Sequence, residues 1–418
     1  MAAENRLRIL LHRAPPAFFG GGVLHILRTQ EWLQRRGIRA EISYEHCSEL
    51  ESFDLVHLLH ARHPELLLRQ LSAARKAGKP VIFSPVYWDW QAVDDHLVKL
   101  FGRDEAMLSA RRREQRLLGI LAWEADLVIA GAAAEQQWLM RDFDLPPERF
   151  CHVPLAWDSQ FASADPAPFA QKTGLKDFVF CVGSICAQEN QLPLIQAMKD
   201  FPAPLFLVSA WNDPAYLEMC RRQAGQNVIF HGPMTLEEIS SAYAASKVHV
   251  APSIGDPMNF TTLAAALAGC NLACADNPAV REYMGDMAWY CNAQDAASVR
   301  GAVEKAFAAP RTGKAREHAA RNFTWQRMAE ALEAAYRKAL TMAPAPRPKL
   351  EQLLEEWTQE LSSQHVEPAD RERLETEIQA LQRELSAVTS TWGYRLYHAA
   401  ARSAPYRLMR KLLRWSRH

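Results

Sequence analysis

The sequence predicts an α/β fold made of two doubly wound parallel sheets, and three observations support this prediction. The chain has 418 residues, a length typical of two or three domains. Short apolar runs alternate with helical segments, a pattern that favours parallel strands joined by crossover helices. The alternation pauses in the turn-rich residues 163–174 and resumes at Phe178. We therefore expect two Rossmann-like domains, residues 1–160 and 161–342, with the carboxyl ends of their strands facing a ligand-binding cleft.

Six short strands are expected in the first domain, with helical segments between them. These strands are residues 7–12, 40–44, 55–59, 81–84, 127–130 and 151–153. Two of the helices, residues 23–36 and 64–77, end before Gly37 and Gly78. Glycine is favoured there because a left-handed residue commonly caps the C-terminus of a helix.

Five strands are expected in the second domain. They are residues 178–182, 205–208, 228–230, 248–251 and 271–274. Thr235 and Glu238 have the spacing of a capping box, which predicts the start of a helix that ends at Ala245. A further helix is expected over residues 259–268 with its N-terminus at the cleft, and another over residues 325–340.

The last part of the chain differs in composition from the two domains. Residues 343–349 are proline-rich and predict a stiff linker. Residues 350–390 are acidic, and apolar residues at alternating spacings of four and three predict a short coiled coil. Residues 391–418 form a basic amphipathic tail in which aromatic residues alternate with arginines. We expect residues 392–418 to dock on an anionic membrane surface, the alternative being a solvated basic helix packed on the acidic segment.

Composition argues against several classes of function. Lys plus Arg and Asp plus Glu number 48 each, so no strong overall field attracts nucleic acid. The eight cysteines form no CxxC pair and no zinc-like spacing with histidine, which predicts reduced thiols and no metal site. Neither a secretory leader nor an apolar run long enough for a membrane span is visible. We expect a cytoplasmic protein that is peripheral on the inner membrane face through its tail.

Short sequence blocks in a fixed order give the chain a family resemblance. In the first domain they are residues 53–57, 84–89, 125–128 and 153–158. In the second domain they are residues 182–191, 242–246, 251–256, 281–286 and 323–325. Over residues 5–340, the order and spacing of these blocks resemble the retaining glycosyltransferases of family four, which have the two-domain GT-B fold. The expected fold class is therefore α/β of the GT-B type, with a C-terminal helical extension.

This resemblance implies an activity and its partners. A sugar would move from a nucleotide-sugar donor to a glycan or lipid-linked acceptor, with retention of anomeric configuration and with neither a metal ion nor another cofactor. Related enzymes build bacterial surface polysaccharides. Catalysis would consist of holding the leaving diphosphate and the acceptor hydroxyl in position. The last helix of the second domain would cross back to the first.

The resemblance also exposes departures on the donor side. The family has Gly-Arg after the first strand of the second domain and Lys five residues later, where this chain has Ser184 and Glu189. Where the family has two glutamates, this chain has Asp256 and Ala264. Losing two cations that grip a diphosphate costs about 3 to 6 kcal/mol of binding. Glu189 adds repulsion between like charges.

The candidate site residues fall into three groups. Backbone amides, hydroxyls and a helix N-terminus predict the donor side, formed by Gly183, Ser184, Asn190, Phe260, Thr261 and Thr262. A glycine turn after the first strand and an aromatic ring predict the acceptor side, formed by Gly21, Gly22 and Tyr87. Side chains able to carry a proton or hold an acceptor hydroxyl are the candidate catalytic residues, His57, Asp89 and Asp256.

Structural roles compete with these functional ones. The glycines at 20–22 can be an ordinary strand-to-helix turn, and Thr261 and Thr262 can belong to a capped core helix. His57 can be a hydrogen-bonded histidine at a sheet edge. Tyr87 can pack in the core instead of stacking on a sugar.

Two other functions are alternatives. Loss of both cations and of the second glutamate favours a catalytically degenerate paralogue that is a partner or scaffold subunit of an active glycosyltransferase. Residues 350–388 would then contact that glycosyltransferase, or a second copy of this chain. A sugar-nucleotide epimerase on the same fold is the third hypothesis.

Overall fold

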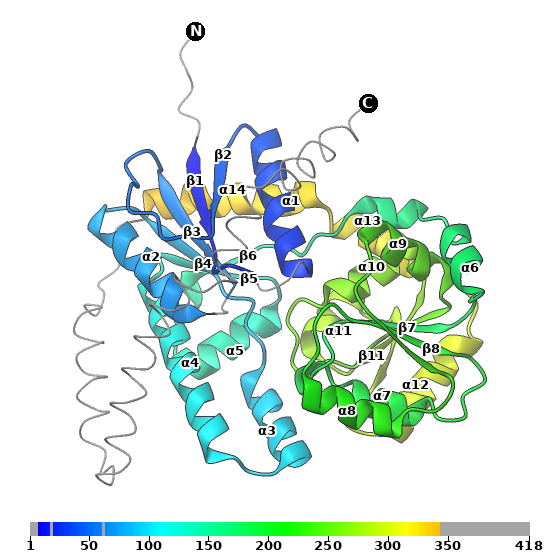
Figure 1. Cartoon of the computed structure of the whole chain (residues 1–418). Coiled ribbons are helices and arrows are strands. Elements are labelled where there is room, and N and C mark those ends of the chain that lie inside the picture. The colour runs from blue at the N-terminus through cyan, green and yellow to red at the C-terminus, as the bar shows by residue number, and fades with distance from the viewer. Residues whose placement is uncertain (1–6, 17–19, 61–62, 343–418) are drawn as a thin grey trace, which may run out of the picture. The chain divides into compact units, whose positions relative to one another are not determined.

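The chain forms two parallel sheets in a computed structural model that describes residues 7–16, 20–60 and 63–342 (Figure 1). The strand order is β2-β1-β3-β4-β5-β6 in the first sheet and β12-β11-β10-β7-β8-β9 in the second. Each sheet starts at an inner strand, grows to one side and then continues on the other. This arrangement is doubly wound, so the predicted α/β fold class is confirmed.

The strands match the expected ones closely. Those of the first sheet are β1 (Arg8–His12), β2 (Arg39–Ser43), β3 (Leu55–Leu59), β4 (Val81–Ser84), β5 (Leu127–Ala130) and β6 (Phe150–His152). Those of the second are β7 (Val179–Val182), β8 (Leu205–Val208), β9 (Val228–His231), β10 (Val248–Ala251), β11 (Asn271–Ala275) and β12 (Ala288–Cys291). Every expected strand is confirmed to within one residue at each end. Sequence reasoning missed β12, because this edge strand is mostly half-buried and lacks a continuous apolar run.

The helices lie between the strands. We call strands β1–β6 and a set of helices the first lobe. These helices are α1 (Gly21–Arg35), α2 (Pro64–Lys76), α3 (Trp90–Phe101), α4 (Glu105–Glu124), α5 (Ala133–Phe143), η1 (Pro147–Arg149) and α14 (Trp325–Thr341). The second lobe contains β7–β12 with η2 (Ser159–Ser163), α6 (Ala167–Thr173), η3 (Ala187–Glu189), α7 (Gln191–Ala197), α8 (Pro214–Gln223), α9 (Leu236–Ala245), α10 (Phe260–Ala268), α11 (Pro278–Met284), α12 (Ala296–Ala308) and α13 (Lys314–Asn322).

The predicted helix ends are found in the structure. Gly37 and Gly78 follow α1 and α2 with positive φ angles of 81° and 66°. At the start of α9, Glu238 N donates to Thr235 Oγ1 at 3.2 Å, and Thr235 N donates to Glu238 Oε2 at 3.0 Å. The capping box is therefore confirmed.

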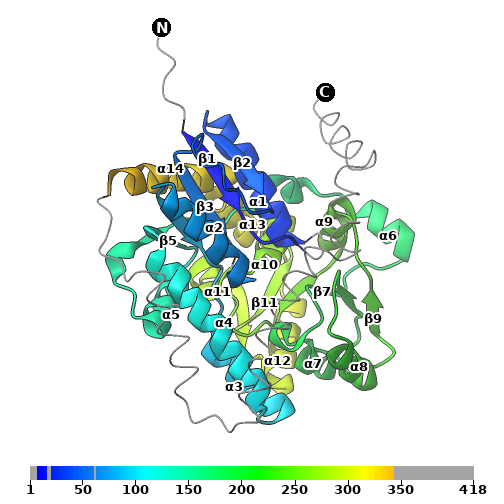
Figure 2. The same cartoon turned by 60° about the vertical axis from the view of Figure 1, so that its left-hand side comes forward.

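Helix α14 returns from the second lobe to the first sheet. Its buried residues Trp325, Met328, Leu332 and Tyr336 pack with Ile9 and Leu11 of β1 in one core cluster. Figures 1 and 2 both show α14 alongside the first sheet and close to α1.

Asp158 fixes the returning helix in place. This residue is 6% exposed. Its carboxylate accepts hydrogen bonds from Arg28 Nε and Nη2 at 3.0 and 2.8 Å, and from Trp325 Nε1 at 2.7 Å. We call these three hydrogen bonds the Asp158 clamp. The clamp joins α1, α14 and the connection that follows β6.

Helix α3 belongs to the first lobe but packs on the second. Its Val93 and Leu97 are buried in the core cluster of the second lobe, together with Ile185, Ala187 and Ile254. Ala187 is the first residue of η3, in the segment that follows β7. Figure 2 shows α3 and α4 extending from the first lobe beside the second. The loop after β7 is therefore covered on one side by α3.

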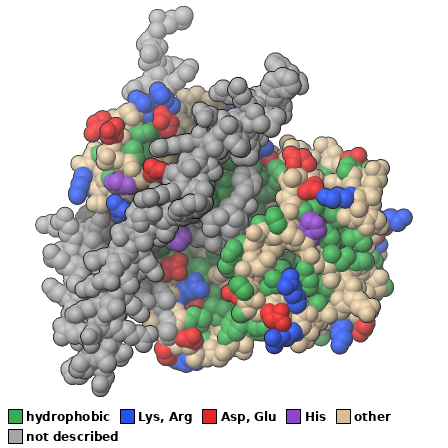
Figure 3. Space-filling model, viewed as in Figure 1, with side chains coloured by type: hydrophobic (Ala, Val, Ile, Leu, Met, Phe, Trp, Pro, Cys, Tyr) green, Lys and Arg blue, Asp and Glu red, His purple; other side chains and the backbone are tan. Residues whose placement is uncertain are grey.

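The visible surface carries charges of both signs. Figure 3 shows Lys and Arg interspersed with Asp and Glu among patches of apolar side chains on the described part of this face. Between residues 7 and 342, leaving out 17–19 and 61–62, no helix is long and apolar enough to cross a bilayer. The predicted linker 343–349, coiled coil 350–390 and basic tail 391–418 lie outside the described residues, so they stay predictions.

Candidate functional site

The turning points of the two sheets face each other. Strands β1 and β7 are the strands at which the strand order reverses, and ligands bind beyond the carboxyl ends of such strands. A Cβ built on Gly21, at the start of α1, would lie 3.5 Å from the ring of Phe260, at the start of α10. The Phe260 ring also lies 5.3 Å from that of His25 and 5.5 Å from that of Trp157 between centroids. We call the region where the loops after β1, β7 and β10 meet the interlobe site.

The loop after β7 places a carboxylate against the backbone of Gly183. Glu189 Oε2 accepts a hydrogen bond from Ser253 Oγ at 2.9 Å. A Cβ built on Gly183 would lie 3.4 Å from the same carboxylate oxygen. The Gly183 N–H donates to Val208 O at 3.1 Å, within the sheet. Gly183 is thus placed at the interlobe site, but its amide is used and a negative charge lies beside it.

Asn190 holds the same loop together. This residue is fully buried, and its Nδ2 donates to Pro252 O at 3.1 Å and to Ala293 O at 2.7 Å. The predicted donor contact through this side-chain amide is therefore corrected, because both of its protons are committed to neighbouring loops. Ser184 is half-buried and its carbonyl accepts from Gln191 Nε2 at 2.8 Å. The Ser184 hydroxyl stays a candidate contact.

Asn259 caps helix α10. Its Oδ1 accepts from Thr262 N at 3.1 Å, from Thr262 Oγ1 at 2.7 Å and from Thr261 Oγ1 at 3.1 Å. The predicted phosphate contacts of the Thr262 amide and of both hydroxyl protons are corrected, since these donors are used inside the first turn. Phe260 instead lies at the contact between the lobes. The first turn of α10 contains no acidic residue, so its partial positive charge is not neutralised from within that turn.

Asp256 shapes the turn before α10. Its Oδ1 accepts from Met258 N at 3.0 Å and from Asn259 N at 3.2 Å. Burial raises the pKa of this carboxyl, although the two backbone hydrogen bonds oppose that increase. The carboxylate therefore has a clear structural role, and its participation in catalysis stays a prediction.

The glycine turn at the start of α1 is tightly surrounded. A Cβ built on Gly22 would lie 3.2 Å from the His60 ring and 3.5 Å from Arg13 Nη1. Arg13 is only 8% exposed. Sequence analysis did not single out Arg13, although it directly follows β1 at the carboxyl edge of the sheet.

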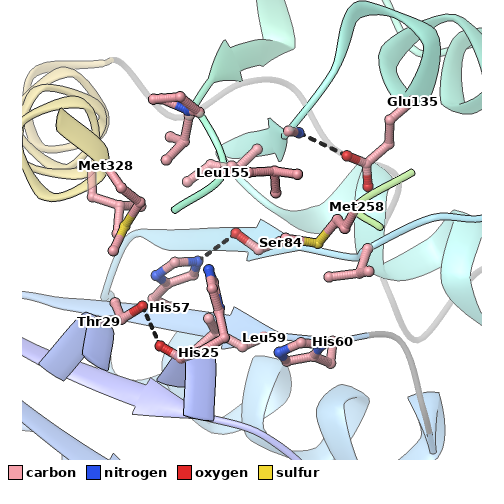
Figure 4. A pocket seen from close by; sticks show the side chains of 16 residues that line it. His25, Thr29, His57, Leu59, His60, Ser84, Glu135, Leu155, Met258 and Met328 are labelled. Atoms are coloured by element: carbon pink, nitrogen blue, oxygen red, sulfur yellow. Dashed lines mark hydrogen bonds between the residues drawn. The ribbon is translucent and has the colours of Figure 1, made fainter. Parts of the chain in front are cut away.

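His57 is held by hydrogen bonds on both sides of its ring. Nδ1 lies 2.8 Å from Tyr336 Oη. On the other side, Nε2 lies 2.7 Å from Ser84 Oγ, the contact shown in Figure 4. Burial lowers its pKa to about 3. The predicted catalytic role is corrected: both nitrogens are occupied, and the neutral imidazole fastens α14 to the sheet.

Two further histidines share this neutral, buried state. Burial lowers the pKa of His12 to about 4 and that of His249 to about 3. We call His12, His57 and His249 the buried histidines. None of the three is more than 2% exposed.

Tyr87 is part of the core. The residue is fully buried, its ring meets that of Phe143 edge-on at 5.2 Å between centroids, and its hydroxyl donates to Asp142 Oδ2 at 2.9 Å. Burial raises the pKa of the phenol. The predicted stacking on an acceptor sugar is corrected, because the ring offers no open face.

Asp89 lies where the first lobe meets the loop after β10. Its N–H donates to Gly255 O at 2.9 Å, and its Oδ1 accepts from Arg141 Nη2 at 2.9 Å. A Cβ built on Gly255 would lie 2.9 Å from Asp89 Cβ. Asp89 is therefore close to the interlobe site and already paired with a guanidinium.

Glu135 is a buried carboxyl that sequence analysis missed. It is 1% exposed, and its two oxygens accept from Tyr87 N at 2.6 Å and from Gly131 N at 2.7 Å. Burial raises its pKa to about 7, and the neighbouring charge of Asp256 acts in the same direction. Its only signal in the sequence is an acidic residue in the first turn of α5, which is too common to identify a site.

A small cavity lies beneath the interlobe site. Its volume is about 40 Å³, with room for a few water molecules but not for a sugar nucleotide. Figure 4 shows His25, His57 and His60 on one side of it and Met258 of the second lobe on the other. Within the described segments, no group of three His, Cys, Asp or Glu side chains could hold a metal ion.

Comparison with known proteins gives a family match within the second lobe. Residues 176–308 match the family model described as Glycosyl transferases group 1. That match runs from the strand before the Gly183 loop to the end of α12 and contains the whole second-lobe side of the interlobe site.

One curated relative matches a part of the chain. The O-antigen chain mannosyltransferase B of Escherichia coli is 24% identical over 176 residues. The matched stretch covers 39% of this chain and 46% of the relative. The chain therefore matches less than half the length of that protein.

Solved structures share the two-lobe fold over most of the chain. Sucrose-phosphate synthase from Thermosynechococcus elongatus superposes with a TM-score of 0.65 at 17% identity, covering 80% of this chain and 99% of that one. Anabaena HepE in complex with UDP and glucose superposes with a TM-score of 0.63 at 15% identity, covering 79% of this chain and all of that one. These likenesses show the fold, two Rossmann-like lobes of the GT-B type.

Proposed function

We propose that this protein is a glycosyltransferase that takes its sugar from a nucleotide-sugar donor. One observation carries the proposal: the turning points of two doubly wound sheets face each other, and the second of these sheets lies in the part that matches the glycosyl transferases group 1 model. Ligands bind at such turning points. The HepE structures of the same fold contain UDP with glucose, or UDP-glucose, which supports this class of donor.

The finer features of the reaction belong to the same proposal. We expect retention of anomeric configuration, no metal ion or other cofactor, and a glycan or lipid-linked acceptor in bacterial surface polysaccharide synthesis. The weak match to an O-antigen mannosyltransferase supports this acceptor class. Catalysis would depend on positioning and on dipoles aimed at the leaving diphosphate. The uncapped glycine turn, the Ser184 hydroxyl and the N-terminus of α10 are the groups at the interlobe site suited to that task.

Calorimetric titration tests the donor. The full chain is titrated with UDP-, GDP-, ADP- and TDP-sugars, and any sugar nucleotide that binds is then tested for release of its nucleoside diphosphate. We expect one nucleotide to bind at submillimolar concentration and to be turned over slowly without an acceptor. No binding of any of them at millimolar concentration would end the proposal.

A degenerate partner subunit is the second candidate, and two observations favour it. The Glu189 carboxylate lies against Gly183 where the family has a cation, and α3 packs on the loop after β7. The triple variant Ser184→Arg, Glu189→Lys and Ala264→Glu restores the charges of the family. If the natural chain binds no nucleotide and the triple variant does, the partner function is favoured over the enzyme.

The peripheral location rests on residues 392–418. We propose that this basic, aromatic segment binds anionic lipid from the cytoplasmic side. Sedimentation with vesicles that contain phosphatidylglycerol is compared for the full chain and for a chain that ends at residue 391. Equal pelleting of the two forms would remove this part of the proposal.

A further inference from the structure

The loop after β7, residues 183–190, contains no Lys or Arg that could offset the charge of a diphosphate. The family places an Arg and a Lys on the loop after β7, and this chain has Ser184 and Glu189 there. The tertiary structure makes the deficit larger, because the Glu189 carboxylate lies against Gly183. A nucleotide-sugar site in this chain therefore needs a cation from elsewhere in the fold.

The first lobe places a cation at the interlobe site. Arg13 follows β1 directly, at the turning point of the first sheet, and is 8% exposed. Its Nη1 lies 3.5 Å from the position that a Cβ on Gly22 would occupy. Gly21, one residue earlier, would bring its Cβ equally close to Phe260 of the second lobe. The guanidinium is therefore next to the turn that touches the donor lobe.

Arg13 Nε donates to Ala14 O at 3.3 Å, and two features near this side chain suit an anion. At the start of α1, Val23 N and Leu24 N donate to Gly20 O at 2.9 and 3.1 Å, and Gly20 has no side chain that could cap the N–H groups before them. The first turn of α1 contains no acidic residue. His25 is neutral at pH 7, because burial and the charge of Arg13 lower its pKa to about 4. The Arg13 guanidinium stays protonated at this pH.

We propose that Arg13 is the residue that binds the diphosphate of the nucleotide-sugar donor, so that the first lobe supplies the countercharge that the second lobe has lost. This inference rests on the proposed function. A guanidinium makes two parallel hydrogen bonds to phosphate oxygens, and Arg13 Nη1 lies beside the glycine turn at which α1 begins. Arg13 is a binding residue, and its role follows from position rather than from any motif.

The test compares nucleoside diphosphates with nucleosides. The full chain is titrated calorimetrically with UDP, GDP, ADP and TDP and with the corresponding nucleosides, and the ratio of the two affinities measures the contribution of the diphosphate. Arg13→Gln removes the charge and keeps a polar side chain of similar reach. Arg35→Gln, at the exposed far end of the same helix, is the matched control for net charge.

We expect Arg13→Gln to lower the affinity for the nucleoside diphosphate about 10- to 100-fold and to leave the affinity for the nucleoside unchanged. Arg35→Gln should change neither affinity. Where Arg13→Gln melts differently from the natural chain, Arg13→Lys takes its place. Lysine keeps the positive charge but cannot make the two parallel hydrogen bonds of a guanidinium, so we expect Arg13→Lys to bind the diphosphate several-fold more weakly than the natural chain does.

The outcomes separate this inference from the proposed function. If the natural chain binds no nucleoside diphosphate, the proposed function and this inference fall together. If the natural chain binds one and the Arg13 variant shows the same ratio, only the inference is overturned. An unchanged ratio is also the result expected if Arg13 binds a phosphate group of the acceptor instead of the donor.

Discussion

Neutralising Glu189 should improve the binding of a nucleoside diphosphate. In the structure, the carboxylate accepts from Ser253 Oγ and lies 3.4 Å from the Cβ position of Gly183. Glu189→Gln keeps an oxygen that can accept the serine hydrogen bond and removes the negative charge. The change therefore tests charge at this place with little change in shape.

The magnitude follows from the geometry. A phosphate that touches the backbone of Gly183 would have its charge centre about 5 Å from the carboxylate, and two unit charges at that separation interact by about 3 kcal/mol at an effective dielectric constant of about 20. Screening at physiological salt roughly halves this energy. We therefore expect the diphosphate to bind about tenfold more tightly to Glu189→Gln.

The assay is calorimetric titration of the full chain with whichever nucleoside diphosphate binds it, at about 0.05 and 0.5 M salt. The gain should be larger at the lower salt concentration, and the affinity for the nucleoside should not change. Glu218→Gln is the matched control, because Glu218 is an exposed acid on α8 that pairs only with its helical neighbour Arg222 among the ion pairs of the described residues. An unchanged or weaker affinity in Glu189→Gln, with the control unaffected, would refute the electrostatic reasoning.

Three further predictions concern stability, each measured as the free energy of unfolding in urea. Asp158→Ala removes the acceptor of the Asp158 clamp and should lower the free energy of unfolding by about 2 to 4 kcal/mol. This loss is smaller than for a fully buried ion pair, because the Arg28 side chain is 31% exposed. A loss below about 1 kcal/mol would contradict the clamp. Gly255→Ala and Gly313→Ala both place a side chain at positive φ, but only the Cβ at position 255 would meet another residue, Asp89. We therefore expect Gly255→Ala to lower the free energy of unfolding by about 1 to 3 kcal/mol more than Gly313→Ala does. Equal losses would argue against close contact between the lobes there. Acidification from pH 7 to pH 5 should destabilise the protein. In the folded protein the buried histidines have pKa values of about 3 to 4 and stay neutral over this range. In the unfolded chain the same histidines have a pKa of about 6.5 and bind protons, which favours the unfolded state. Glu135 opposes this, since its raised pKa of about 7 lets the folded state hold a proton that the unfolded state releases. Glu135→Gln should therefore steepen the decline over this pH range by about 2 kcal/mol, and an unchanged slope would show that Glu135 is ionised in the folded protein.

The architecture could be predicted from the sequence to a large extent. Strands such as β3 and β11 are buried over their whole length, so each appears in the sequence as a mostly apolar run between turn residues. Local signals such as the Thr235 capping box act over three or four residues and need no tertiary information. β12 was missed because an edge strand that is half-buried has no such run.

The side-chain roles at the candidate site could not be predicted in the same way. His57, Tyr87 and Asn190 all stand next to motif residues, and the tertiary structure commits each of them to hydrogen bonds with partners distant in the chain. A histidine that faces a hydroxyl on both sides has the same sequence context as one that faces a substrate. Only the packed structure shows which groups are left for a ligand.

The sequence by itself determined the two alternating α/β units, their order and the lack of Arg or Lys at Ser184 and Glu189 after β7, because each of these depends on neighbouring residues in the chain. The tertiary structure decided where charge meets the site. It brings the Glu189 carboxylate onto Gly183, places Arg13 beside the turn at Gly22, and joins that turn to Phe260 of the other lobe. Charges act through space over a few ångströms, so their balance at a site depends on folded distances, which no local pattern of residues contains.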